Sequence, residues 1–134
     1  MSTISKHLVA VYGSLRKTKG NHNLLYTGKH ETEYIGTESL KGNFTMVSLG
    51  GYPGVIQTPD KQNEIVIELY KVNDVTALNL DNLEGFHSPG SKFNFYDKIQ
   101  IETSKGIASM YTLGESYLDH DEVESGDWVK YTSK

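Results

Sequence analysis

The chain has 134 residues, the size of one compact domain, and we expect residues 1–134 to form a single domain. It carries 13 basic and 17 acidic residues without a Lys/Arg cluster, so nucleic acid is not an expected partner. The absence of cysteine excludes disulfides, thiolate nucleophiles and cysteine-ligated zinc. The first apolar run is too short for a signal peptide or a membrane span, so we expect a cytoplasmic protein without a membrane partner.

Short apolar runs separated by glycine, proline and polar residues predict a strand-rich chain. We expect strands in five segments, which are residues 8–12, 33–49, 64–72, 93–101 and 107–113. The second segment is long for one strand, and Gly42 marks the place where it is expected to kink or break. Residues 50–54, with the sequence Gly-Gly-Tyr-Pro-Gly, predict a turn.

One helix is predicted among these strands, over residues 75–84. Asn73 and Asp74 are both residue types that cap helices, and Asp74 is the expected N-cap. Gly85 stands where a glycine often ends a helix. The pattern predicts an α+β fold, with a small mixed, mostly antiparallel barrel-like sheet and a few short helices.

The segment Tyr12-Gly13-Ser14-Leu15-Arg16 directly follows the first apolar run. A Gly-Ser step at the end of a buried strand predicts a sharp turn whose backbone N–H groups have no strand partner. Such N–H groups form a nest that suits a carboxylate or an oxyanion. The segment is therefore a candidate anion site, although Gly-Ser at a strand end also occurs as a plain turn.

The segment Leu80-Asp81-Asn82-Leu83-Glu84-Gly85 places Glu84 in the last turn of the predicted helix. A carboxylate there faces the negative end of the helix dipole. If this helix end is also partly buried, both effects raise the pKa of Glu84. A carboxyl with a raised pKa accepts and returns a proton near neutral pH. From this motif alone, an exposed glutamate at a frayed helix end is the alternative.

Together, the two motifs resemble those of the gamma-glutamylcyclotransferase-like family in their order and spacing. The turn Gly51-Tyr52-Pro53-Gly54, the strand of residues 67–72 and the segment Phe95-Tyr96-Asp97-Lys98 also look like parts of that family. The resemblance spans roughly residues 8–113. Lys98 stands where the family usually has Arg, and Ile67 stands where it often has Gly.

The resemblance implies a small barrel-like sheet with a cavity and an enzyme of the acyltransferase or lyase type. Its substrate would be a small gamma-glutamyl amine or gamma-glutamyl amino acid, and its product 5-oxoproline. By residue match, the resemblance implies Glu84 as the general acid/base, with substrate binding by Tyr12, Gly13, Ser14 and Leu15. Further candidates for the cavity wall are Arg16, Pro53, Gly54 and Tyr96. Tyr111 is a candidate for either the core or the wall.

The implied reaction needs no protein nucleophile, because the substrate's own α-amine attacks its side-chain carbonyl. No metal or organic cofactor is therefore expected, and the five histidines show no metal-ligand spacing. The acidic segment of residues 119–124 is expected to be a solvated loop. The expected partner is a small gamma-glutamyl substrate, bound by a monomer or a weak homodimer.

Two other functions stay open from the sequence. The first is a non-enzymatic member of the same fold that binds a small anionic metabolite or docks a partner protein, which the departures at Ile67 and Lys98 suggest. The second is another acyl-transfer or lyase reaction that uses the same acid/base. Both alternatives keep the predicted fold.

Overall fold

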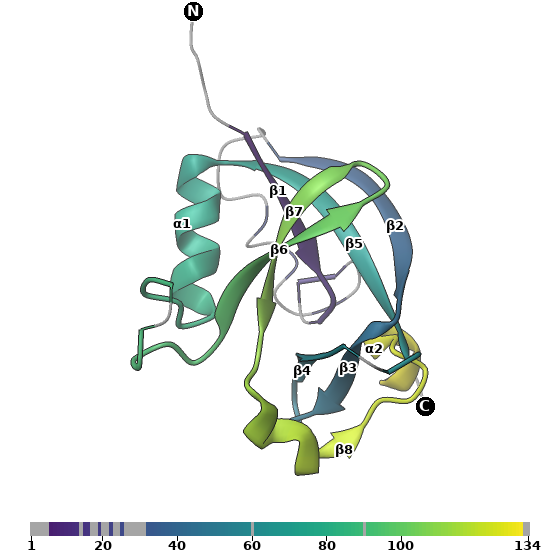
Figure 1. The fold of residues 1–134 in the computed structure, drawn as a ribbon. Coiled ribbons are helices and arrows are strands. Elements are labelled where there is room, and N and C mark those ends of the chain that lie inside the picture. Colours follow the sequence, from purple (N-terminus) through teal and green to yellow (C-terminus); the bar gives the residue numbers. More distant parts are fainter. Residues whose placement is uncertain are drawn as a thin grey trace, which may run out of the picture.

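The structure is a computed structural model that describes residues 6–13, 15–16, 19, 22, 25, 32–59, 61–89 and 91–132. Its strands are β1 (Lys6–Val11), β2 (Glu33–Lys41), β3 (Asn43–Ser48), β4 (Pro53–Thr58), β5 (Glu64–Asn73), β6 (Asp97–Thr103), β7 (Gly106–Thr112) and β8 (Asp121–Glu122). Its helices are α1 (Asp74–Leu83), the 3-10 helix η2 (Glu115–Asp119) and α2 (Trp128–Tyr131). A five-stranded sheet has the order β2-β5-β1-β7-β6, and a three-stranded sheet has the order β4-β3-β8 (Figure 1).

The middle strand of the larger sheet is β1. It pairs antiparallel with β5 and parallel with β7, where Val9 lies opposite Ser109. The pairs β2–β5 and β6–β7 are antiparallel. The predicted α+β fold with a mixed, mostly antiparallel sheet is therefore confirmed. Within the described ranges the sheet does not close into a barrel, because β2 and β6 remain its two edges.

Both faces of β1 are buried, which explains why its apolar residues are continuous rather than alternating. Val9 and Val11 pack with Leu80 of α1 in one apolar cluster. Ala10 packs with Met46 of β3 and Trp128 of α2 in a second cluster. Figure 1 shows α1 to one side of the larger sheet and the smaller sheet with α2 towards its far end. Strand β1 is therefore covered on both faces and lies in the interior of the molecule.

The long segment of residues 33–49 is broken where the sequence predicted. Gly42 has a φ of +82° and Asn43 has a φ of +69°, in the left-handed region that glycine and asparagine tolerate best. The break sends β2 into the larger sheet and β3 into the smaller one. The predicted turn over residues 50–54 is too long, because β4 already begins at Pro53, opposite Ser48.

The N-cap of α1 is Asn73, and the prediction of Asp74 is wrong. The Thr76 N–H donates to Asn73 Oδ1 at 2.9 Å, and Asp74 is the first helical residue. A carboxylate in the first turn still interacts favourably with the helix dipole. The helix ends at Leu83, and Gly85 follows with a φ of +68°.

Two further predictions need correction in the second half of the chain. The strand expected over residues 93–101 starts only at Asp97, and the residues before it form a bent loop. The acidic segment of residues 119–124 is mostly exposed, but Asp121 and Glu122 pair with β3 as β8. No helix in the part of the chain that the structure describes is long and apolar enough to cross a membrane.

Candidate functional site

A cavity of about 440 Å³ opens beside the end of β1. This volume is within the usual range of small-molecule sites, roughly 300–1,000 Å³. The wall is formed by residues 10–13 and Leu15 at and after the end of β1, residues 51–53 at the start of β4, Leu83 and Glu84 at the end of α1, Phe95 and Tyr96 before β6, and Tyr111 of β7. Segments that lie far apart in the sequence therefore meet at one site.

The way in which α1 ends holds Glu84 at this wall. The Phe86 N–H donates to the Asp81 carbonyl at 2.9 Å, and the Gly85 N–H donates to the Asn82 carbonyl at 3.3 Å. This pair of bonds is a Schellman motif, which needs a left-handed residue at Gly85. A Cβ atom at Gly85 would also lie 3.1 Å from the Cβ of Phe95. Backbone angle and space therefore both favour glycine beside Glu84.

The segment before β6 is bonded to the same helix end. The Phe95 N–H donates to the Gly85 carbonyl at 2.9 Å, and the Tyr96 N–H donates to the Glu84 carbonyl at 3.2 Å. Tyr96 Oη donates to the Pro53 carbonyl at 2.6 Å, which links this segment to β4. These bonds bring Glu84, Phe95 and Tyr96 to one wall of the cavity.

Burial raises the pKa of Glu84 from 4.5 to about 7, because withdrawal from water disfavours the charged carboxylate. Among the described residues, Glu84 takes part in none of the ion pairs. The sequence argument invoked both burial and the helix dipole, and burial is the cause that the structure identifies. A carboxyl with this pKa exchanges its proton readily near neutral pH.

Three tyrosines surround Glu84, and each hydroxyl already donates its proton to a fixed acceptor. Tyr12 Oη donates to the Tyr111 carbonyl at 2.7 Å, Tyr111 Oη donates to Asp81 Oδ1 at 2.6 Å, and Tyr96 Oη donates to β4. Burial is the main cause that raises the pKa of each tyrosine, and the charge of Glu84 contributes to all three. Glu84 is the only carboxyl among the described wall residues.

The turn after β1 packs directly on β4. The Arg16 N–H donates to the Gly13 carbonyl at 3.0 Å and closes the turn. A Cβ atom at Gly13 would lie 2.8 Å from the Cγ of Pro53, so glycine permits this close approach. Tyr12, Gly13 and Leu15 are buried and line the cavity, as do the predicted Pro53 and Tyr96. Ser14 lies outside the described residues.

Arg16 does not line the described wall, contrary to expectation. Its Nε donates to Glu68 Oε2 at 2.8 Å, and its Nη1 donates to Asp127 Oδ1 at 2.7 Å. Asp127 also caps α2 by accepting from the Lys130 N–H at 3.2 Å. Burial by itself lowers the pKa of Arg16, but the hydrogen bonds to Glu68 and Asp127 raise it on balance. This network connects the turn to β5 and to the C-terminal helix.

Gly54 is a second candidate that the structure does not place on the wall. A Cβ atom there would lie 2.0 Å from the Cδ1 of Leu113. The Leu113 N–H donates to the Val55 carbonyl at 2.8 Å. Gly54 therefore allows β4 to pack closely on the residue that follows β7.

The two departures from the family pattern also lie away from the described wall. Lys98 Nζ donates to Asp81 Oδ1 at 2.9 Å and lies 4.7 Å from the centre of the Phe86 ring. Ile67 is fully buried in the core. In the described part of the chain, no group of three or more potential His, Asp or Glu ligands is arranged to hold a metal ion.

The sequence analysis missed six wall residues and left a seventh open. The missed residues lie one or two positions before a predicted site residue in the sequence, and they are Ala10, Val11, Gly51, Tyr52, Leu83 and Phe95. That adjacency is the only signal that the sequence carries for them. Tyr111 belongs to both of its proposed places, since it is 5% exposed and lines the cavity.

The fold and the cavity define a small α+β protein whose small-molecule site contains one half-buried carboxyl, that of Glu84. The family described as gamma-glutamyl cyclotransferase, AIG2-like, matches residues 9–130. A putative gamma-glutamylcyclotransferase of Vibrio cholerae is 32% identical over 125 residues, which cover 93% of this chain and 97% of that protein. The chain therefore belongs to the AIG2-like gamma-glutamyl cyclotransferase family, as the sequence resemblance predicted.

Two further relatives agree with this assignment. The gamma-L-glutamyl-butirosin B gamma-glutamyl cyclotransferase of Niallia circulans is 32% identical over 125 residues, which cover 90% of this chain and 74% of that protein. The solution structure of protein ytfP from Escherichia coli superposes with a TM-score of 0.68 at 28% identity, covering 92% of this chain and 97% of the other. The prediction of a gamma-glutamylcyclotransferase-like enzyme is thereby confirmed at the level of the family.

Proposed function

We propose that this protein converts a small gamma-glutamyl amine or gamma-glutamyl amino acid into 5-oxoproline and the free amine or amino acid. Glu84 is the general acid/base of this reaction. The observation that supports the proposal most directly is a half-buried carboxyl with a pKa of about 7 on the wall of a small-molecule cavity. A general base is most effective when its pKa lies near the working pH.

The bonds and protons of the reaction balance without a further reactant. The α-nitrogen of the gamma-glutamyl group attacks the side-chain carbonyl carbon and forms the lactam C–N bond. The bond from that carbon to the leaving nitrogen breaks. Glu84 takes a proton from the α-nitrogen and delivers one to the leaving nitrogen, so the carboxylate is restored. Because the attack is intramolecular, the cavity mainly has to hold the substrate in a folded conformation.

The turn after β1 is the proposed site for the polar gamma-glutamyl group. Backbone groups of Tyr12, Gly13, Ser14 and Leu15 bind its α-carboxylate, and a nearby N–H supports the oxyanion of the tetrahedral intermediate. The closeness of this turn to Glu84 supports the assignment, since both lie on the same cavity. The hydroxyls of Tyr12 and Tyr96, which also line this cavity, are held by hydrogen bonds to backbone carbonyls and so keep the shape of its wall.

The name of one relative supports the proposed substrate class. The Niallia circulans relative is named for a gamma-glutamyl compound, which supports a gamma-glutamyl substrate here too. We further propose that the protein acts in the cytoplasm without a cofactor, as a single domain and as a monomer or weak homodimer.

The proposal is tested with the variant Glu84→Gln, which keeps the shape of the side chain and removes the base. We expect 5-oxoproline formation to fall by about 10²-fold or more, the usual contribution of general acid–base catalysis. The assay is mass-spectrometric detection of 5-oxoproline from gamma-glutamyl amines, gamma-glutamyl amino acids and glutathione. Glu102→Gln, at an exposed position of β6, is the matched control and should retain full activity. Near-normal turnover by Glu84→Gln contradicts the assigned role.

A further inference from the structure

Three large apolar side chains of the cavity wall are left partly exposed. Tyr52 is 42% exposed, Leu83 is 41% exposed and Phe95 is 45% exposed, and all three line the cavity. They come from the β3–β4 turn, the end of α1 and the segment before β6. Exposed apolar surface that gathers from separate segments at one cavity is typical of a binding surface.

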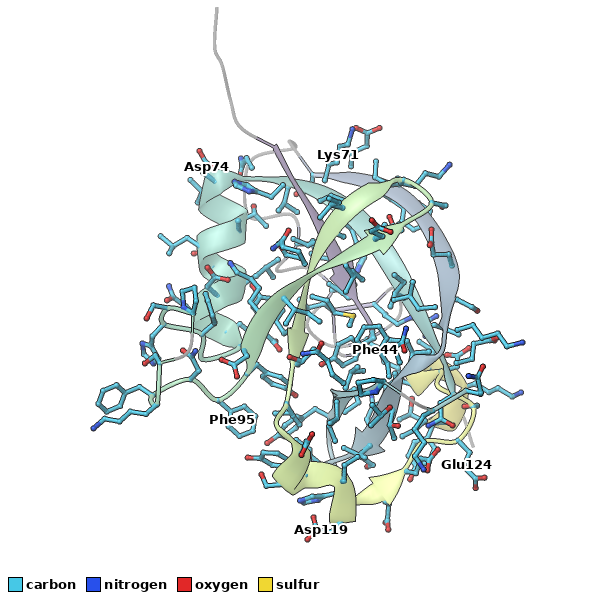
Figure 2. All side chains as sticks on the ribbon, in the orientation of Figure 1. Phe44, Lys71, Asp74, Phe95, Asp119 and Glu124 are labelled. Carbon is cyan, nitrogen blue, oxygen red and sulfur yellow. The ribbon has the colours of Figure 1, made fainter. Side chains whose placement is uncertain are left out.

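Phe95 is the centre of this aromatic group and is held in place from several sides. Its ring centre lies 6.3 Å from that of Tyr52 and 5.0 Å from that of Tyr96, in tilted and edge-to-face arrangements. The ring of Tyr117, on η2, lies 6.3 Å away. Figure 2 shows Phe95 on the segment that joins α1 to β6, close to η2. With its N–H bonded to Gly85, Phe95 forms a fixed part of the wall.

Glu84 lines the same cavity as the turn at Gly13 and the side chains of Leu83 and Phe95. The gamma-glutamyl group carries an amine and a carboxylate, which suit the backbone groups of the turn at Gly13. The leaving nitrogen has to lie within hydrogen-bond reach of Glu84 to receive its proton. Leu83 directly precedes Glu84, and Phe95 is bonded to the residue that follows it. A leaving nitrogen bound at Glu84 therefore places its substituent near Leu83 and Phe95.

The volume of the cavity leaves room for such a substituent. A cavity of about 440 Å³ corresponds to about fifteen water molecules at ~30 Å³ each. The gamma-glutamyl group has nine non-hydrogen atoms and occupies only part of that space. The remainder is bounded partly by Leu83 and by the rings of Phe95 and Tyr52, of which Tyr52 also carries a hydroxyl.

We propose that Tyr52, Leu83 and Phe95 form a binding subsite for the leaving group, and that this subsite selects an uncharged aromatic or bulky apolar amine. The inference rests on the proposed function, because it takes Glu84 as the group that protonates the leaving nitrogen. Aromatic rings pack favourably against flat apolar groups in offset or edge-to-face contacts. The described wall has no Lys or Arg, so a carboxylate on the leaving group finds no cationic partner there.

A leaving amine with a second, cationic end is the rival occupant, because aromatic faces also attract cations. An apolar and a cationic leaving group can be distinguished by changing only the substituent on the leaving nitrogen. We therefore compare the gamma-glutamyl conjugates of ethylamine, 2-phenylethylamine, phenylalanine and 1,4-diaminobutane. The second adds a ring to the first, the third adds a carboxylate to the second, and the fourth carries an ammonium group.

The primary measurement is calorimetric binding of the four conjugates to Glu84→Gln, in which turnover is suppressed. We expect the 2-phenylethylamine conjugate to bind about tenfold or more tightly than the ethylamine conjugate, as a filled apolar pocket requires. It should also bind more tightly than the phenylalanine and 1,4-diaminobutane conjugates. Equal dissociation constants for the first two, tightest binding of either charged conjugate, or no measurable binding overturns the inference.

Variants then assign the effect to the subsite. In a Glu84→Gln background, Phe95→Ala should bring the ratio of the two dissociation constants towards one. Phe93→Ala, at a 72% exposed ring that does not line the described wall, is the matched control and should leave the ratio unchanged. If Phe95→Ala fails to fold by circular dichroism, Tyr52→Ala replaces it. A ratio that survives in the folded variant overturns the inference.

Turnover by the wild type separates the two proposals. Ring-dependent binding without 5-oxoproline from any conjugate contradicts the proposed reaction and leaves the apolar subsite standing. Turnover that does not distinguish the ring, together with equal binding, supports the reaction and overturns the subsite.

Discussion

Glu68 is buried and Glu84 is half-buried, and among the described residues only Glu68 has charged and hydroxyl partners. Glu68 is 4% exposed and accepts hydrogen bonds from Arg16 Nε and from Tyr70 Oη, each at 2.8 Å. Glu84 forms no ion pair among the described residues, and burial raises its pKa to about 7. Glu68 links strand β5 to the turn after β1 through its ion pair with Arg16. Glu84, whose pKa is raised, can exchange a proton near neutral pH.

The comparison also shows how one turn serves both regions. Gly13 and Leu15 face the cavity of Glu84, and Arg16 reaches the network of Glu68. Because Asp127 completes that network, the C-terminal helix α2 is linked to the wall of the cavity. The ion-pair network of Glu68, Arg16 and Asp127 therefore holds in place the turn that lines the cavity of Glu84.

The largest expected effect on stability comes from removing the cation of the Glu68–Arg16–Asp127 network. Arg16→Met leaves the carboxylates of Glu68 and Asp127 without their cation, and we expect a loss of about 3–5 kcal/mol in the free energy of unfolding. Urea denaturation at pH 7 measures this loss. Lys71→Met, at an exposed position of β5, is the matched control. A loss no larger than that of the control shows that the network does not stabilise the fold.

At Glu84, by contrast, removing the charge is expected to increase the stability of the fold. The folded pKa of Glu84 is about 7 against 4.5 for an ordinary glutamate, so the wild type loses stability as pH rises between these values. Since one pKa unit is 1.36 kcal/mol, Glu84→Gln should be more stable than the wild type by up to about 3 kcal/mol at pH 8. The advantage should vanish near pH 4. Parallel pH profiles of urea denaturation for the two proteins would rule out the raised pKa.

The same pKa predicts the dependence of catalysis on pH. The proposed base is the deprotonated carboxylate of Glu84, so kcat/KM should rise about tenfold per pH unit up to about pH 7 and then level off. Initial rates of 5-oxoproline formation between pH 5 and 8 test this. An inflection near pH 4.5 instead indicates that Glu84 is not the group that limits the rate.

The smallest expected effects come from removing one tyrosine hydroxyl beside Glu68 and one beside Glu84. Tyr70→Phe removes a hydrogen bond to the carboxylate of Glu68 and should cost about 1.5–3 kcal/mol, whereas Tyr96→Phe removes one to the neutral Pro53 carbonyl and should cost about 1 kcal/mol. Thermal or urea unfolding of the two variants measures the difference. The reverse order contradicts the distinction between the two regions.

Local patterns in the sequence were sufficient to place Glu84. A helix pattern followed by glycine locates the end of α1 within a few residues, and the Schellman bonds confirm that geometry. The choice between Asn73 and Asp74 as the N-cap was wrong because both side chains can cap a helix. Only the path of the chain out of β5 decides which oxygen meets the Thr76 N–H.

Arg16 could not be placed by such patterns. Its partners Glu68 and Asp127 lie 52 and 111 residues away along the chain, so only the tertiary fold reveals that it is buried in an ion-pair network. Tyr52 and Phe95 could not be placed by local patterns either. Both lie in loops, and only the positions of β4 and β6 in the fold bring their rings together. Strand β4 was missed because Pro53 is a turn residue type and is unusual inside a sheet.

During synthesis, β1 leaves the ribosome long before its parallel partner. Val9 pairs with Ser109, which is made 100 residues later, a delay of roughly 5–20 s at the usual rate of translation. Tyr12 and Tyr111, which meet across that gap, cannot close the cavity until β7 has emerged. A nascent chain arrested before residue 106 should therefore bind no substrate, and its apolar first strand has to be protected from aggregation until then.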